Sequence, residues 1–551
     1  MVSVSNPEVI PTLYPTRPGF PKSDLYATLR PYSKDNNGLK VVFNTQDEVL
    51  HKHLKSPIAP LYSLTNTVTF EPLVDEVLEC FEQQLDMKFS GNGASFNFGN
   101  YLQYFAFDVM GTLTFSKRYG FLEKGQDVQG ILAAIWSHWK GSAAVTQITW
   151  ADPIVSRNRF VRAFRKTGGM AIIGFIDTVL RERLQEKRST TSEKESSSTA
   201  VSKSRHVDFL DHFLRAKEEH DDLPPWAPTA WMFSNVLAGS DSTATVIRTV
   251  MCSIHHGGDH LLCNPETLEK LHRELSGAGV TMPYPRWAEV SNLPYLDACV
   301  QEGIRLHPPF SFHFERVVPS GGIELLGKFL PEGTVVGGNP WVTNRHEGTF
   351  GPRPDSWDPE RWLKGGDAYR RKLEQMLLTF GAGRRVCLGK HIGILELKKV
   401  VPFLVMNYKM QVVDPEAFCA ENALFFKQEG FFAKLEKQTE ISKDSIITRH
   451  VSPYLKSSHN HLITHGILWR MCIRCTGNVR MLRQPSPAYN LAAHILGKPL
   501  EAAGTSADMN RIDYYRLTKA NVQLTHAVAG YIAGYQVDRV VFWVELSAAL
   551  R

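Results

Sequence analysis

The stretch FGAGRRVCLGK, residues 380–390, decides how the rest of the chain is interpreted. Its glycines, including Gly381 and Gly389, let the backbone turn tightly and approach a flat ligand closely. Cys387 stands just before an expected helix, where backbone N–H groups and the helix dipole favour a thiolate over a thiol. The alternative is an inert buried thiol in a glycine-rich turn, because free cysteines are commonly buried. For an isolated cysteine the inert thiol is the preferred interpretation, so the choice between the two depends on the residues around Cys387.

The regions on either side of this loop predict a mainly α protein with a small β region. Residues 70–187 carry apolar residues at three- and four-residue spacing, which is typical of amphipathic helices. A long helix is expected after Pro228, in TAWMFSNVLAGSDSTATVIRTVM, and another after the cysteine loop, in HIGILELKKVVPFLVMNY. Beyond Pro308, short β-branched runs separated by Gly and Pro predict a small sheet of hairpins.

Composition excludes several classes of protein. The chain has 551 residues, 43% hydrophobic and 21% charged, which is typical of a globular protein. The net charge is only +6 and no Lys/Arg block is long enough to predict a nucleic-acid-binding arm. Eight scattered cysteines suit a reducing compartment. The first thirty residues lack the blocks of a signal peptide, and we expect no transmembrane segment because no run of roughly 18 apolar residues occurs.

Two segments look different from the rest. Residues 188–206, RSTTSEKESSSTAVSKSRH, are dense in Ser, Thr and charge, and predict a mobile surface connection. Residues 438–551 carry no periodic pattern linked to what precedes them, and predict an unassigned tail that is either disordered or a non-native extension. Four ligands of a zinc site are available in this tail among Cys472, Cys475, His459, His461 and His465. A single C-x-x-C without a second matched pair is a weak signal, so the extension is the preferred interpretation.

The loop at 380–390 matches F-x-x-G-x-R-x-C-x-G at every fixed position, and so resembles the signature of the cytochrome P450 family. The resemblance implies a P450 fold holding haem b, with Cys387 as the axial ligand of the iron. A thiolate ligand pushes electron density toward bound oxygen and favours O–O cleavage. Arg385 would bind a haem propionate. Phe380, Gly381 and Gly389 complete the expected cofactor contacts in the loop.

Two other motifs follow the order found in the family. EGIRLHPP places Glu302 and Arg305 three residues apart on one helical face, where they can pair. DPERW supplies Arg361. In the family these residues resemble a buried Glu–Arg–Arg network behind the haem, so we expect a structural role for all three. Taken alone, E-x-x-R means little, because most such pairs lie on solvated helix faces.

The string NVLAGSDSTA resembles the family's oxygen-activation motif, A-G-x-[DE]-T-T. Gly239 is expected to leave room for dioxygen, and Ala238 and Ser242 share a helix face because they are four residues apart. Ser242 stands at the family's threonine, with Thr243 next to it, and its hydroxyl can relay protons or bond back to the helix. Asp241 would deliver protons. The alternative is that these are ordinary polar residues on a helix.

The remaining expected contacts, with the haem propionates and the substrate, lie in segments whose sequences are less specific for the family. Arg316, in FERVV, stands where the family directs an arginine to a propionate. His51 and Lys55, in HKHLKSPIAPLYS, stand where the family usually carries W-x-x-x-R; both can donate to a carboxylate. A surface helix explains that segment equally well. The candidates for the substrate pocket, for which ordinary core packing is the alternative, are Ala238, Gly239, Phe310, Phe312, His313 and Phe314.

The resemblance covers residues 1–437, and the amino-acid sequence of several segments is similar to that of the fungal pisatin-demethylase-like branch. The chain starts after the family's membrane anchor, first helix and first strands, so we expect an N-terminally shortened domain. Fungal members are typically tethered to the endoplasmic reticulum membrane, but this chain carries no anchor and is expected to be cytoplasmic or peripheral.

The resemblance implies a monooxygenase that inserts one atom of O2 into an apolar, aromatic or polycyclic secondary metabolite. Electrons would come from an NADPH-cytochrome P450 reductase, which Lys390, Lys398 and Lys399 could steer electrostatically. A solvated helix face explains these lysines equally well. Two alternative functions stay open: a haem-thiolate dehydratase or isomerase, which Asp241 with Ser242 argues against, and a truncated product without catalytic activity.

Overall fold

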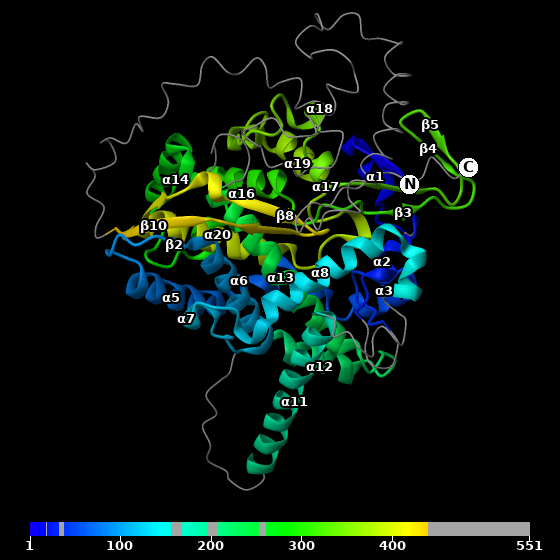
Figure 1. Ribbon diagram of the computed structural model, residues 1–551, viewed down its shortest axis with the longest axis horizontal. Helices are drawn as coiled ribbons and strands as arrows, with labels where there is room; N and C mark the ends of the chain where they lie inside the picture. Colours follow the sequence, from blue (N-terminus) through cyan, green and yellow to red (C-terminus); the bar gives the residue numbers. More distant parts are fainter. Residues whose placement is uncertain (18, 32–37, 156–167, 195–206, 253–260, 439–551) are drawn as a thin grey trace, which may run out of the picture. The chain divides into compact units, whose positions relative to one another are not determined.

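The computed structural model describes residues 1–17, 19–31, 38–155, 168–194, 207–252 and 261–438 (Figure 1). The chain divides into a unit from Met1 to Ile441 and a unit from Ser442 to Arg551, and every described residue belongs to the first. The tail and its Cys472 and Cys475 therefore lie outside the described residues. No helix among the described residues is long and apolar enough to cross a membrane.

Helices dominate the described part, as predicted (Figure 1). The helices of ten or more residues are α5 Glu71–Lys88, α6 Phe98–Phe115, α8 Ile131–Gln147, α11 Gly168–Lys194, α12 Phe209–Glu219, α13 Ala227–Met251, α14 Pro265–Gly277, α16 Pro294–Leu306, α19 Gly366–Met376 and α20 Lys390–Asn407. The shorter ones are α1 Ile10–Leu13, α2 Leu25–Thr28, α3 Glu48–Lys55, α4 Leu64–Val68, α7 Phe121–Lys124, α9 Asp152–Val155, α15 Trp287–Val290, α17 Pro340–Thr343 and α18 Glu347–Phe350. Single 3-10 turns are η1 Pro7–Val9, η2 Ala59–Tyr62, η3 Val128–Gly130, η4 Thr149–Ala151, η5 Leu261–Cys263, η6 Pro359–Trp362, η7 Gly383–Arg385 and η8 Pro415–Ala417.

The expected surface connection at 188–206 is only partly described. Helix α11 continues through the first part of it, to Lys194, because Gln185 to Lys194 contains no helix-breaking Gly or Pro. Residues 195–206 lie outside the described residues.

The strands form small sheets, also as predicted (Figure 1). Strand β1 pairs in parallel with β6, and β6 pairs antiparallel with β3; β10 pairs antiparallel with both β2 and β7; β4–β5 and β8–β9 are hairpins. The hairpin β8–β9 pairs Asn422 with Phe426, so its tip lies at residues 423–425. The strands are β1 Val2–Val4, β2 Phe96–Asn97, β3 Arg316–Val317, β4 Ile323–Leu325, β5 Lys328–Leu330, β6 Val335–Gly338, β7 Tyr408–Val412, β8 Cys419–Asn422, β9 Phe426–Glu429 and β10 Phe432–Lys437.

Two buried helices carry the motifs found in the sequence. Helix α13 is apolar on most of its circumference, as expected for a helix inside a large core, and packs extensively on α6. Helix α20 follows the cysteine loop and is buried from Leu395 to Asn407. The two helices pack together: a Cβ added to Gly393 would lie 3.6 Å from the hydroxyl of Thr243. The core therefore brings the NVLAGSDSTA segment and the cysteine loop to neighbouring helices.

Candidate functional site

The cysteine loop has a shape that only glycine allows at one position. Gly381 and Gly383 have left-handed backbone conformations, with φ of 65° and 60°. A Cβ added to Gly383 would lie 2.0 Å from the carbonyl oxygen of Tyr14, so no other residue fits there. The backbone N–H of Cys387 donates to the carbonyl oxygen of Phe380 over 2.7 Å and closes the loop.

The thiol of Cys387 is exposed just before α20 begins at Lys390. Local burial raises the pKa of this thiol, although the residue has accessible surface, because neighbouring protein excludes much of its water. Backbone N–H groups of Gly389 and Lys390, together with the charges of Lys390 and Lys55, act in the opposite direction. A Cβ added to Gly389 would meet nothing within 4 Å, so open space adjoins the loop. The sulfur is thus a ligand that a cationic metal centre would convert to the thiolate.

The NVLAGSDSTA segment presents a small accessible face on an otherwise buried helix. Ala238 is exposed and Ser242 is partly exposed, which confirms that they share a face of α13. The hydroxyl of Ser242 donates to the carbonyl oxygen of Ala238. The hydroxyl of Thr243 donates to the carbonyl oxygen of Gly239 over 2.9 Å, but Thr243 is buried toward Gly393 of α20. Ser242 and Thr243 therefore point to different surroundings.

Gly239 has a packing role that the sequence did not indicate. A Cβ added at this position would lie 2.8 Å from the sulfur and terminal methyl group of Met110, on α6. The missing side chain therefore accommodates Met110 where α13 packs closely on α6. The expected room for dioxygen at Gly239 stays a prediction.

Asp241 is held by residues that the sequence did not indicate. Its carboxylate accepts a hydrogen bond from the side-chain amide of Gln103, and Gln103 accepts one from Arg248 over 3.0 Å. Burial raises the pKa of Asp241 to about 6, while the Gln103 bond and the charge of Arg248 limit the rise. The group can therefore gain and lose a proton near neutral pH.

A cluster of cations lies beside the cysteine loop, and we call it the cation cluster. It consists of Lys22, His51, Lys55, Arg316, Arg384 and Arg385. Glu48 pairs with Arg385 over 2.6 Å and with Arg384 over 3.1 Å. Lys55 donates to the carbonyl oxygen of Arg384 over 2.9 Å. Arg316 donates to the carbonyl oxygen of Glu315 over 2.8 Å. The cluster includes every propionate contact expected from the sequence, and adds Lys22 and Arg384.

The positive charges of this cluster repel one another, which disfavours the protonated forms of its members. Burial, together with the charges of Arg385 and Lys55, lowers the pKa of His51 to about 3. Burial and the charges of Arg316 and Arg385 also lower the pKa of Lys22. Nδ1 of His51 is buried without a hydrogen-bond partner among the described residues. Within the same part of the chain, Glu48 is the one carboxylate that pairs with this set, so an anionic group placed among the cations would relieve their repulsion.

A buried ionic network fixes the segment that precedes the cysteine loop. Glu302, which is 0% exposed, accepts from Arg305 over 2.7 and 2.8 Å, from Arg361 over 3.0 Å and from the indole of Trp362 over 2.9 Å. Arg305 also donates to the carbonyl oxygen of Asn344 over 3.0 Å.

Asn344 in turn carries this network to the loop. Its side-chain oxygen accepts from the backbone N–H of Leu378 over 3.0 Å, and its side-chain nitrogen donates to Thr379 over 2.7 Å. Leu378 and Thr379 lead directly into Phe380. The geometry agrees with the structural role expected for Glu302, Arg305 and Arg361.

Known proteins identify the fold around this site. The sequence model of the family described as "Cytochrome P450" matches residues 1–434. The chain belongs to the cytochrome P450 family. Among its relatives, it is 54% identical over 444 residues to "Cytochrome P450 monooxygenase mfmA" of Annulohypoxylon moriforme, covering 80% of this chain and 84% of the relative. It is 49% identical over 443 residues to "Cytochrome P450 monooxygenase AFLA_114810" of Aspergillus flavus, with the same coverage.

A third relative is longer than this chain. "Cytochrome P450 monooxygenase mpaDE" of Penicillium roqueforti is 48% identical over 452 residues, which are 81% of this chain and 51% of the relative. Among solved structures, the crystal structure of the cytochrome P450DA haem domain superposes with a TM-score of 0.62 at 16% identity, over 79% of this chain and 87% of that one. This likeness shows the P450 fold. None of the three relatives is named as a pisatin demethylase, so that branch stays a prediction.

The family and these relatives show that the chain is an oxidoreductase that incorporates oxygen, a cytochrome P450 monooxygenase. The residues fit the haem cofactor that the family implies. Cys387 offers its sulfur beside open space, and the cation cluster has Glu48 as its single carboxylate partner among the described residues. A flat ligand with a central metal and two carboxylates matches both features. No group of three or more possible metal ligands occurs among His, Cys, Asp and Glu in the described residues.

The expected pocket residues separate in the structure. Phe312 and Phe314 are buried, and the edge of Phe314 lies 4.0 Å from a Cβ added to Gly381, so both are core residues. Nε2 of His313 lies 2.8 Å from the hydroxyl of Ser3 in a hydrogen bond. Phe310 is partly exposed and is the expected pocket aromatic that keeps an accessible ring. The alternation arises because side chains of an extended segment point to opposite sides in turn.

The lysines after the cysteine loop also differ from the prediction. Lys398 and Lys399 are only 5% and 0% exposed, so they form neither a docking surface nor a solvated face. Lys399 pairs with Glu71 over 2.5 Å and with Asp75 over 2.7 Å. Lys390 is partly exposed. The correction has a physical reason, because carboxylates of two other helices pair with the buried lysines: those of α5 pair with Lys399, and Asp297 of α16 pairs with Lys398.

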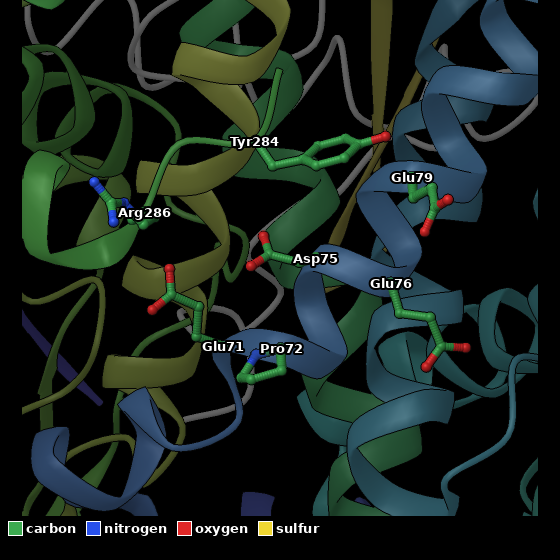
Figure 2. Close-up of a pocket in the computed structure, with 7 residues that line it drawn as sticks. All are labelled: Glu71, Pro72, Asp75, Glu76, Glu79, Tyr284 and Arg286. Carbon is green, nitrogen blue, oxygen red and sulfur yellow. The ribbon is translucent and has the colours of Figure 1, made fainter. Parts of the chain in front are cut away.

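Glu71 and Asp75 also line an acidic hollow of 460 Å³, which Figure 2 shows with its side chains as sticks. Its other labelled residues are Pro72, Glu76, Glu79, Tyr284 and Arg286. None of the site residues predicted from the sequence lines this hollow. It is therefore separate from the cysteine loop, and its acidic side chains include the partners of the buried Lys399.

Proposed function

We propose that this chain holds haem b between α13 and the 380–390 loop, with Cys387 as the axial ligand of the iron. The observation that carries the proposal is the exposed Cys387 sulfur, which accepts backbone N–H groups at the start of α20. When bound, the haem supplies the activation of O2, and thiolate ligation favours O–O cleavage. The turn at Gly381 and the open space at Gly389 let the loop approach the face of a flat cofactor.

The cation cluster would bind the two propionates. Arg316, Arg385, His51 and Lys55 were expected in this role, and their mutual repulsion supports it. An anion among these residues raises their lowered pKa values, so propionate binding and protonation of His51 are coupled. Arg384 joins them because its side chain pairs with the same Glu48 as Arg385.

Asp241 and Ser242 would deliver protons during turnover. Asp241 has a pKa raised to about 6, so it can take up and release a proton near neutral pH, and Ser242 is the neighbouring hydroxyl on the accessible face of α13. The Ser242 hydroxyl donates to Ala238 in this structure, so it turns when it passes a proton to a ligand. We assign Thr243, which the sequence also suggested, to the packing of α13 on α20.

The substrate would be an apolar aromatic or polycyclic secondary metabolite, oxidised with electrons from an NADPH-cytochrome P450 reductase. The partly exposed Phe310 supports an aromatic substrate, because aromatic rings pack well edge to face. The relatives from Annulohypoxylon moriforme and Penicillium roqueforti are named as cytochrome P450 monooxygenases, which supports the insertion of oxygen into an organic substrate.

The experiment that tests this function is a carbon monoxide difference spectrum of the dithionite-reduced protein. Wild-type protein is expected to give the red-shifted Soret band of a thiolate-ligated haem, and Cys387→Ala to lose it. Cys419→Ala is the matched control, because Cys419 is also exposed but lies on β8. A band typical of histidine ligation in the wild type, or a red-shifted band that survives in Cys387→Ala, would refute the proposal.

A further inference from the structure

A continuous cluster of aromatic rings runs from the cation cluster into helix α8. Arg385 donates to the carbonyl oxygen of Val42 over 3.2 Å, and the next residue, Phe43, stacks on Phe310 at 5.9 Å between ring centroids. Phe310 meets Trp139 edge to face at 5.6 Å. The cluster therefore begins beside the residues that would bind the propionates and ends on α8.

The hairpin β8–β9 completes the inner end of this cluster. Phe425, at the hairpin tip, stacks on Trp139 at 5.6 Å with an interplanar angle of 13°, and meets Phe310 edge to face at 5.2 Å. Backbone hydrogen bonds fix the hairpin to the Phe310 segment, from Ser311 to Leu424 and from Phe426 to Pro309. Three separate parts of the chain thus place Trp139, Phe310 and Phe425 in contact.

Trp139 carries an unused hydrogen-bond donor. The residue is 3% exposed, and its indole N–H is buried without a hydrogen-bond partner in the described structure. A buried indole N–H normally finds a partner, because leaving it unpaired destabilises the folded protein. The neighbouring His138 is similar: burial lowers its pKa to about 4, so it stays neutral at pH 7, and its Nε2 is buried without a partner.

Phe310 and Phe43 form the accessible side of this aromatic cluster. Phe43 is 37% exposed and Phe310 is partly exposed, so an apolar ligand can contact the rings from the accessible side. Phe310 touches Trp139 only edge to face. For a ligand to reach the indole, the Phe310 ring has to move aside, and side-chain rotamer changes are common on binding.

We propose that Trp139 recognises the substrate: its indole N–H donates to a neutral oxygen acceptor carried by an aromatic ring system that lies against Phe310 and Phe425. The rings of the cluster supply the apolar contacts, and the N–H supplies the orientation. A neutral acceptor, such as a ketone, ether or phenol oxygen, is favoured over a carboxylate because apolar rings surround the donor. The inference rests on the proposed function, since it assigns the substrate class of that pocket.

The test compares two ligands of the same shape by equilibrium dialysis against the full-length protein as purified with haem. 2-Acetylnaphthalene carries a carbonyl oxygen, and 2-isopropenylnaphthalene has a CH2 group in its place. Wild-type protein is expected to bind the ketone about 3- to 10-fold more tightly, which is the effect of one neutral hydrogen bond. Trp139→Phe keeps an aromatic ring and deletes the donor, so it is expected to remove the preference.

The control is Trp136→Phe, on the same helix but outside the cluster, which is expected to keep the preference for the ketone. The inference is overturned if Trp139→Phe still prefers the ketone. If Trp139→Phe does not fold, the affinities of the wild-type protein still test the inference, because equal affinities for the two ligands also overturn it.

A carbon monoxide spectrum of the same samples separates this inference from the proposed function. A ketone preference that depends on Trp139 in protein without thiolate ligation would uphold the binding site and refute the haem assignment. Thiolate ligation without a ketone preference would uphold the haem assignment and refute the binding site at Trp139.

Discussion

Replacing Glu302 by Gln is expected to remove a large part of the protein's stability. Five donor groups converge on this fully buried carboxylate: two from Arg305, one from Arg361, the indole of Trp362 and the backbone N–H of Asp358. Burial opposes its ionisation, but the charges of the two arginines outweigh burial and lower the pKa of Glu302, so it carries a full negative charge.

The size of the effect follows from what Gln leaves behind. The variant keeps one oxygen acceptor, while its NH2 group faces N–H donors and cannot bond to them. Two buried guanidinium groups then lose their counter-charge. Breaking a buried ion pair by removing one partner costs about 3–5 kcal/mol. A domain typically has about 5–15 kcal/mol of unfolding free energy in total, so this loss is severe.

Urea unfolding followed by circular dichroism measures this loss. The control is Glu269→Gln, which breaks an exposed i,i+4 pair with Arg273 at 3.2 Å and is expected to change the unfolding free energy by less than about 0.5 kcal/mol. Haem content should fall together with stability in Glu302→Gln, because the network leads through Asn344 to the segment before Phe380. An unfolding free energy within about 0.5 kcal/mol of wild type would refute the reasoning.

Two further predictions concern acids whose pKa values are raised by burial. The maximal oxidation rate should fall as pH rises through about 6, where Asp241 loses its proton, and Asp241→Asn should be slower and independent of pH there; an unchanged pH–rate profile in the variant would contradict this role. Burial alone raises the pKa of Glu396 well above its ordinary value, and neither of its carboxyl oxygens has a hydrogen-bond partner in the described structure. Because Glu396 stays protonated when folded but ionises when unfolded above about pH 4.3, wild type should lose stability as pH rises from there. Glu396→Gln should lose less, so thermal unfolding curves that run parallel at all pH values would contradict the assignment.

Sequence reasoning predicted the features that are local in the chain. The cysteine loop is a run of eleven residues, and its glycines and Cys387 act through the backbone of that same run. Glu302 and Arg305 are three residues apart on α16, so helix geometry alone brings them together. The shared face of Ala238 and Ser242 was predictable for the same reason.

Features that depend on distant segments were not predictable in this way. Lys399 is paired by Glu71, which is 328 residues away in the chain, and nothing around Lys399 indicates this partner. Arg385 bonds to Glu48 across 337 residues. Met110 on α6 lies beside Gly239, and the motif around Gly239 does not indicate this contact. A single sequence gives residue types and periodicity, but not which buried charges meet.

The same physical effect acts in opposite directions on the bases and the acids of the proposed site. Burial lowers the pKa values of Lys22 and His51, and raises those of Cys387 and Asp241. In both cases burial disfavours the charged form. A bound group with anionic edges and a cationic centre would restore charge to the cations and to the sulfur together. Cofactor binding should therefore stabilise this fold, and the proton released at Cys387 on ligation would make that stabilisation depend on pH.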